Sequence, residues 1–171
     1  MFNLRAATAL LVVILLLIYG AIFFQLRRPL AEGYSDFISF YTAGKILQRG
    51  AARQLYDLRL QYEVQREVAP EVSIRQAALP FVRPPFEAWL FLPFAYLPYK
   101  VAFVAWNLLS GGCLLGITLL LRKESPQLQG FSLAFTWLAI VSYFPVFVTI
   151  LQGQDSIVLL GIYVIAYILL S

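Results

Sequence analysis

Histidine is absent from this sequence, and cysteine occurs once, as Cys113. Without histidine the chain lacks the usual general base and the commonest metal ligand, so proton transfer would depend on Asp, Glu, Lys or Tyr. A single cysteine within an apolar run supplies neither a disulfide framework nor a thiolate metal site. We therefore expect no cofactor, and we leave only a divalent metal ion open.

Charged residues are also scarce, at 13% of 171 residues, whereas 61% are hydrophobic. The mean hydropathy of +0.77 lies far outside the range of soluble globular proteins. Nine of the thirteen Lys and Arg residues lie between Arg27 and Arg83. A basic segment between hydrophobic spans indicates contact with membrane lipid and its phosphates rather than with nucleic acid. The composition predicts an all-α, polytopic membrane protein.

The first long apolar run extends from Ala6 to Leu26. It can cross a hydrocarbon core of about 30 Å, because a helix rises about 1.5 Å per residue. A cleaved signal peptide is the competing interpretation, but the run is too long and no small-x-small cleavage site precedes Arg27 and Arg28. We therefore expect a retained transmembrane helix at 6–26.

The remaining chain divides at its prolines and polar breaks. Pro93 and Pro98 interrupt a long apolar stretch, and Pro145 is expected to bend a later span. The final run is short for a span and has no flanking charge, so we expect 1–171 to be one transmembrane domain that forms the N-terminal part of a longer protein. The expected segments are an outward loop at 27–85, an interfacial helix at 86–96, and spans at 99–121, 131–151 and 154–171.

The outward loop contains two helical patterns. From Tyr34 to Gly50, the aromatic residues recur on one helical face, which is typical of an amphipathic juxtamembrane helix in the headgroup layer. Gly50 is suited to ending that helix. Asp57 is placed to cap a second helix that runs to about Ala69, with Arg59 and Glu63 paired four residues apart.

Charge only partly determines the topology. The N-terminus and the loop from Arg122 to Gly130 are both basic and are expected on one side, which the positive-inside rule makes the cytoplasm. The loop at 27–85 then faces outward despite its cations, a conflict that is softened because long loops obey the rule poorly. We expect a multi-pass protein of the cell membrane with a cytoplasmic N-terminus.

Asp36 is the best candidate for catalysis, because it follows the first span at the level where a lipid-borne substrate presents its polar head. A carboxylate there can accept a proton from a sugar hydroxyl as that oxygen attacks. The alternative is that Asp36 caps the helix that begins at Phe37 and complements its dipole.

Basic residues are the candidates for holding phosphate. Lys45, Arg49 and Arg53 recur at intervals of four residues, and Arg83 precedes a rigid Pro-Pro pair. Snorkelling toward the headgroups is the alternative for each of them. We expect Glu87 to pair with Arg83. Gln154 and Asp155 lie between apolar helices, either at a polar cavity or in a simple helix–helix turn.

A series of short motifs follows in order along almost the whole chain. They are Tyr34-Ser35-Asp36-Phe37, Phe40-Tyr41, Ala43-Gly44, Leu55-Tyr56-Asp57, Gln61, Arg83-Pro84-Pro85-Phe86, Leu92-Pro93, Leu97-Pro98-Tyr99, Trp106 and Gln152-Gly153-Gln154. Their order resembles glycosyltransferase family 87, which includes polyprenyl-phosphate-mannose-dependent mannosyltransferases of the GT-C superfamily. Many GT-C enzymes carry paired acids where this chain has Ser35 and Asp36, and family members are more than twice as long as this chain.

The resemblance implies GT-C-type helices and an inverting transfer of a sugar, with mannose favoured, from a polyprenyl-phosphate donor to a lipid or glycan acceptor on the outer face. Asp36 would be the catalytic base. The substrate-binding residues would be Lys45, Arg49, Arg83, Tyr41 and Gln154. The alternative function is a non-catalytic membrane subunit that binds lipid or a partner protein through the loop at 27–85, with Asp36 as an ordinary cap.

Overall fold

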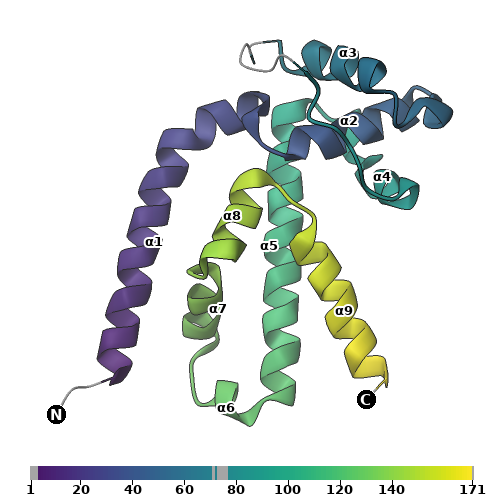
Figure 1. Cartoon of the computed structure of the whole chain (residues 1–171). Coiled ribbons are helices and arrows are strands. Elements are labelled where there is room, and N and C mark those ends of the chain that lie inside the picture. Colours follow the sequence, from purple (N-terminus) through teal and green to yellow (C-terminus); the bar gives the residue numbers. More distant parts are fainter. Residues whose placement is uncertain (1–3, 71, 73–76, 171) are drawn as a thin grey trace. The chain divides into compact units, whose positions relative to one another are not determined.

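The computed structural model describes residues 4–70, 72 and 77–170. Helices account for 80% of the chain, and the described residues contain no strand, which confirms the expected all-α class. The chain forms two compact units. One comprises Arg27–Leu108, and the other comprises the chain before it together with the chain from Leu109 onward (Figure 1).

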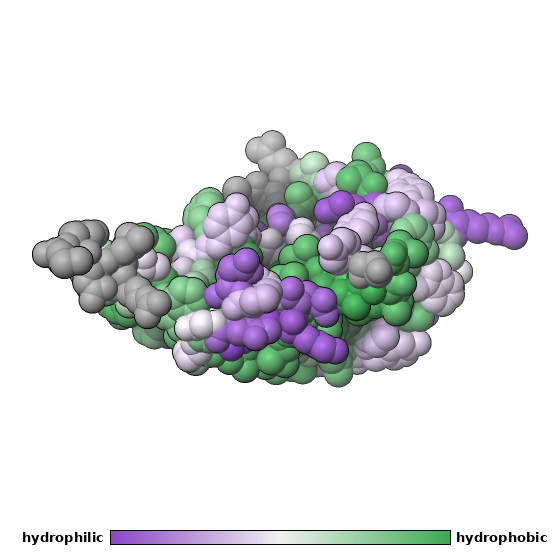
Figure 2. All heavy atoms as spheres, turned by 90° about the horizontal axis from the view of Figure 1, so that it is seen from below, coloured by the Kyte–Doolittle hydropathy of each residue, from purple (hydrophilic) through white to green (hydrophobic). Residues whose placement is uncertain are grey.

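Long apolar helices dominate the second of these units. Helix α1 covers Leu4–Pro29, and α5 covers Tyr99–Glu124, so each extends a few residues beyond the expected span. Both are long and apolar enough to cross a membrane. Figure 2, a view from below, shows a group of hydrophilic residues near the centre of this face and others toward its right edge, all set among hydrophobic residues.

The expected span at 131–151 is a bent pair of helices. Helix α7 covers Leu133–Val141 and α8 covers Phe144–Gln152, and they meet at an angle of 72°. The break falls at Ser142 and Tyr143, and Pro145 lies in the first turn of α8, where its missing N–H costs no helical hydrogen bond. The bend therefore precedes Pro145 instead of centring on it. The pair counts as a third possible span if it crosses as one unit.

Helix α9, Ser156–Leu170, is a shorter apolar helix that follows a tight turn at Gly153. Gly153 has a φ of 65°, a left-handed conformation that glycine adopts without strain. In the core of this unit, Leu114 and Ile117 of α5 pack with Ile157 of α9. Tyr19 of α1 stacks on Phe147 of α8, with ring centroids 4.1 Å apart.

A short helix that we did not expect, α6 at Pro126–Gln129, lies in the polar loop after α5. Arg122 organises this loop through one guanidinium nitrogen. It donates hydrogen bonds to the carbonyl oxygens of Leu128 and Phe131 at 2.8 and 2.6 Å, and to the hydroxyl of Thr136 at 3.0 Å. These bonds join the end of α5 to the start of α7.

The Arg27–Leu108 unit contains the helices of the loop that we expect to face outward. A π-helical turn at Leu30–Tyr34 follows α1, and Gly33 within it has a φ of 116°. A Cβ at Gly33 would lie 2.5 Å from the Ala69 Cβ, so only glycine fits. Helix α2 covers Phe37–Gln48, α3 covers Leu58–Val68 and α4 covers Pro85–Phe91, followed by a 3₁₀ turn at Phe94–Tyr96.

Local signals determine where α2 and α3 end and begin, as the sequence predicts. The N–H groups of Gly50 and Ala51 donate to the carbonyls of Leu47 and Ile46, which is the pairing of a Schellman motif. The Asp57 carboxylate accepts hydrogen bonds from the N–H groups of Arg59 and Leu60. The expected cap is therefore confirmed.

The expected ion pair on α3 is also confirmed. The Arg59 guanidinium lies 3.4 Å from the Glu63 carboxylate. Both side chains are largely exposed, at 89% and 61%. Such a pair contributes little to stability, because water screens it.

The surroundings of α2 differ from the amphipathic pattern that we expected. Every residue of α2 from Phe37 to Gly44 is buried, so both its apolar and its small polar positions face protein. At Gly44, a Cβ would lie 2.6 Å from the Phe91 carbonyl oxygen, and this close approach lets α4 pack directly on α2. Helix α2 is therefore the centre of this unit.

Two glutamines of α3 hold the extended segment before α4. The buried amide of Gln61 donates to the Leu55 carbonyl and accepts from the Phe81 N–H, at 2.7 and 2.8 Å. The Gln65 amide makes the same two kinds of bond with the backbone of Leu79, at 2.8 and 2.9 Å. The two glutamines thereby satisfy three backbone groups, at Leu79 and Phe81, of an extended segment that pairs with no strand.

Candidate functional site

Asp36 lies at the N-terminal end of α2, half-buried, with its backbone in the right-handed helical region. Its side chain makes no capping hydrogen bond to the α2 backbone. The side-chain cap that we considered as its alternative role is therefore not formed. Next to it, the buried hydroxyl of Ser35 lies 2.9 Å from the hydroxyl of Tyr99, which fixes the start of α2 against α5.

An aromatic core supports α2 behind this acid. The ring of Phe40 stacks on Phe91 with centroids 4.8 Å apart, and Phe91 lies 4.5 Å from Trp106. Phe37, directly after Asp36, contacts the rings of Phe91 and Trp106 at 6.2 and 6.3 Å. Such interlocked rings allow little movement, so the backbone that carries Asp36 is held in one position.

Tyr41 belongs to the same core, and its side chain is buried. Its hydroxyl donates to the Leu97 carbonyl at 2.8 Å. Burial, and then the negative charge of Glu67, raise the pKa of the Tyr41 phenol above its ordinary value. The phenol is therefore a neutral donor at physiological pH, and it ties α2 to the turn that precedes α5.

The cations expected to hold phosphate lie toward the other end of α2. At 1.5 Å per residue, Lys45 is about 14 Å along the helix from Asp36, and Arg49 is about 20 Å from it. The Lys45 ammonium donates to the Gln48 side chain at 2.9 Å and lies 5.8 Å from the centre of the Tyr41 ring. Arg49 binds both carboxylate oxygens of Glu67 at 2.8 Å. Lys45 and Arg49 are therefore engaged within the protein and lie apart from Asp36.

Arg83 is exposed and lies just before α4. Its carbonyl accepts a hydrogen bond from the Tyr56 hydroxyl at 2.8 Å, which fixes its backbone against the start of α3. Glu87, in the first turn of α4, is buried at 9% exposure. The ion pair that we expect between Glu87 and Arg83 stays a prediction.

Gln154 belongs to the other unit, in the turn between α8 and α9. It is half-buried, and its N–H donates to the Thr149 carbonyl at 2.9 Å. Asp155, which follows it, is only 1% exposed. The sequence marked this acid as lying between apolar helices, but it could not show that the turn encloses the carboxylate so completely.

Sequence reasoning missed the structural role of two glutamines of α3, since Gln61 was named only as a residue of the family resemblance and Gln65 was not named. Gln61 and Gln65 lie four residues apart, on the helical face that also carries Val64, and all three are buried. A proline-rich extended segment follows in the sequence and needs partners for its backbone groups. Two glutamines on one helical face, followed by an extended segment that needs hydrogen-bond partners, were the sequence features that could have predicted this contact.

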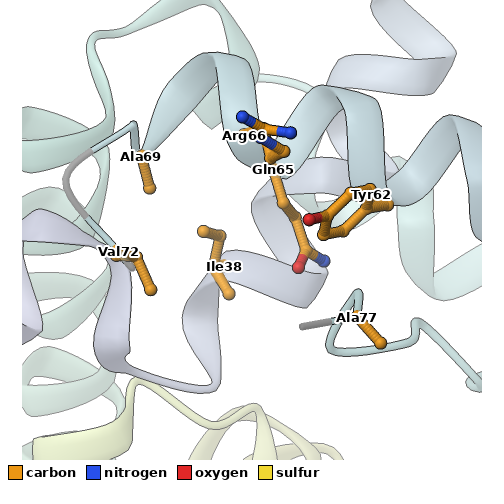
Figure 3. A pocket seen from close by; sticks show the side chains of 7 residues that line it. All are labelled: Ile38, Tyr62, Gln65, Arg66, Ala69, Val72 and Ala77. Atoms are coloured by element: carbon orange, nitrogen blue, oxygen red, sulfur yellow. The ribbon is translucent and has the colours of Figure 1, made fainter. Parts of the chain in front are cut away.

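A small cavity lies between α2 and the C-terminal half of α3. Ile38 projects into it from α2, and Tyr62 and Gln65 border it from α3 (Figure 3). Its volume is about 20 Å³, which accommodates one water molecule and excludes a sugar. Across the residues described, no group of three or more His, Cys, Asp or Glu side chains is arranged to hold a metal ion.

Comparison with known protein families gives a match. The family model described as glycosyltransferase family 87 matches residues 81–171, just over half of the chain. Arg83 and Gln154 lie inside the matched segment, whereas Asp36, Tyr41, Lys45 and Arg49 precede it. No curated protein and no solved structure matches this chain.

Proposed function

The chain belongs to glycosyltransferase family 87, and we propose that it transfers mannose from a polyprenyl-phosphate donor to a lipid or glycan acceptor at the outer face of the cell membrane. The family match is the observation that carries the proposal, and it confirms the resemblance seen in the motifs. In this proposal the helices are of the GT-C type, the N-terminus is cytoplasmic, and the loop at 27–85 faces outward.

Asp36 is the proposed base. An acceptor hydroxyl attacks the anomeric carbon of the donor sugar, and Asp36 takes the proton from that hydroxyl as the new C–O bond forms. The bond from the anomeric carbon to the phosphate oxygen breaks, and polyprenyl phosphate leaves with the electron pair. Attack on the face opposite the leaving group inverts the configuration of the sugar. The half-buried position of Asp36 at the N-terminal end of α2 favours this role.

The phosphate needs a cation, and Arg83 is the strongest of those proposed. It is exposed, it precedes two prolines that stiffen the backbone, and it lies within the segment that matches the family. An arginine can hold phosphate through two parallel hydrogen bonds. Arg49 would first have to leave Glu67, and Lys45 would have to leave Gln48. Tyr41 would act through its position beneath Lys45. Gln154 belongs to the other unit, and its role in binding substrate stays a prediction.

The test compares two acids that both precede a helix, Asp36 and Asp57. The full chain and its variants would be reconstituted in membranes with radiolabelled polyprenyl-phosphate mannose, and transfer to acceptor would be measured. Loss of a general base costs about 10²- to 10⁴-fold, so Asp36→Asn should lose transfer by that factor. Asp57→Asn should keep it, because asparagine caps a helix as well as aspartate does.

Two outcomes contradict parts of the proposal in different ways. Full turnover by Asp36→Asn removes this residue from the mechanism while leaving the enzyme class intact. An unaltered chain that binds polyprenyl phosphate but transfers no sugar favours the alternative, a membrane subunit that binds lipid or a partner through its 27–85 loop.

A further inference from the structure

Helix α4 has one face in the protein core and one face exposed. Ala88 and Phe91 are completely buried against the rest of the Arg27–Leu108 unit. On the other side, Phe86 is 70% exposed and Trp89 is 61% exposed, with Leu90 beside them. Large aromatic side chains that are exposed together indicate a surface that contacts something other than water.

The exposed apolar residues continue along the chain on both sides of α4. Val82 precedes the helix, Tyr96 and Leu97 follow it, and Val101, Val104 and Leu108 continue the series into α5. Helix α5 is long and apolar enough to cross a membrane, so its exposed apolar side chains are suited to lipid. The exposed face of α4 thus leads directly into a lipid-facing helix.

The charges of this stretch are of one sign at the surface. Between Phe81 and Leu108 the sequence has a single carboxylate, Glu87, and the structure buries it. The exposed charged residues are Arg83, before α4, and Lys100, at the start of α5. A stretch with exposed aromatic side chains, flanking cations and no exposed acid of its own matches the boundary between acyl chains and lipid phosphates.

We propose that α4 is a membrane-docking element whose exposed face, formed by Phe86, Trp89 and Leu90, inserts at the headgroup–acyl boundary of the bilayer. Lys100 contacts the phosphates of anionic lipids, and Arg83 adds positive charge at the same boundary. This surface acts on the bilayer itself and does not depend on sugar transfer. Tryptophan suits such a position, because its ring is apolar while its N–H bonds to the wet headgroup layer.

The test measures the depth of Trp89 in the membrane by fluorescence. The full chain and a Trp89→Phe variant would be reconstituted in vesicles of phosphatidylcholine and phosphatidylglycerol whose acyl chains carry bromine either near the headgroup or near the chain end. Subtracting the variant's emission isolates Trp89 from Trp106 and Trp137. Bromine near the headgroup should quench most of this emission, and bromine at the chain end should quench much less.

Three results would overturn the docking proposal. Quenching by aqueous iodide without quenching by bromolipid places the face in water. Quenching by neither reagent means that protein covers the face, whether another segment or a second copy. Stronger quenching by the deep bromine places Trp89 inside the hydrocarbon core.

The role of the cations has its own readout. In mixed vesicles, brominated phosphatidylglycerol should quench Trp89 more strongly than brominated phosphatidylcholine at the same fraction. Lys100→Gln should reduce that excess, because it removes one attractive charge beside the surface. Equal quenching by both lipids in the unaltered protein would overturn the assignment of anionic lipid.

Discussion

The two compact units are stabilised by different kinds of interior. In the Arg27–Leu108 unit, aromatic rings interlock around α2, and buried glutamines satisfy the backbone of an extended segment. In the other unit, a few aliphatic side chains such as Leu114 and Ile157 form the core, and long apolar helices expose most of their surface. The first unit thus carries a specific interior of its own, whereas the second is built for apolar surroundings.

The largest expected effect concerns α5, which contributes to both units. Trp106→Ala should lower the free energy of unfolding by about 3–5 kcal/mol, because Trp106 is completely buried among Phe37, Phe91 and Phe94. Leu119→Ala, on the same helix but 49% exposed, should change it by no more than about 0.5 kcal/mol. The measurement is unfolding by SDS in mixed micelles, and equal losses would contradict the contrast between the units.

A smaller effect is expected from two glycines. Gly44→Ala should cost about 1–3 kcal/mol, because its new methyl group would meet the backbone of Phe91. Gly116→Ala should be neutral or stabilising by up to about 1 kcal/mol, since nothing lies within 4 Å of its added Cβ and alanine favours a helix. The same unfolding measurement applies. If both variants are neutral, α4 does not approach α2 as closely as described.

The smallest expected effect is the difference in stability loss between removing the cap of α3 and removing its exposed ion pair. Asp57→Ala should cost about 1 kcal/mol, because the N–H groups of Arg59 and Leu60 lose their acceptor. Arg59→Ala removes only the exposed pair with Glu63 and should cost about 0.3 kcal/mol. Circular dichroism during thermal unfolding can rank the two variants. A larger loss for Arg59→Ala would reverse this assignment.

Local chemistry explains which features the sequence could predict. Gly50 and Asp57 act through backbone groups a few residues away, so the limits of α2 and α3 follow from their neighbours alone. The burial of α2 did not follow, because its partners Phe91 and Trp106 are distant in sequence and its small residues gave a helical wheel that looked half polar. The spacing of apolar residues shows which residue types share a face of a helix. It does not show which faces other helices will bury.

In the candidate site, as in the fold, the sequence could predict local features and could not predict contacts between distant residues. The position of Asp36 before α2 follows from the pattern around Phe37. The engagement of Arg49 by Glu67 did not, because these residues lie on different helices and meet only after α2 and α3 have packed. The family could be inferred because its motifs are short and local, and the family match covers several of them.

Arg122 has a consequence for where α5 sits relative to the water boundary. A guanidinium stays charged at any physiological pH, and its transfer from water into hydrocarbon has a high free-energy cost. The same guanidinium donates hydrogen bonds to the Leu128 and Phe131 carbonyls and to the Thr136 hydroxyl. It therefore limits how far both α5 and α7 can move into the hydrocarbon. A shift of α5 toward the hydrocarbon would move the beginning of α7 as well. One charged side chain, Arg122, therefore holds both helices at the water boundary.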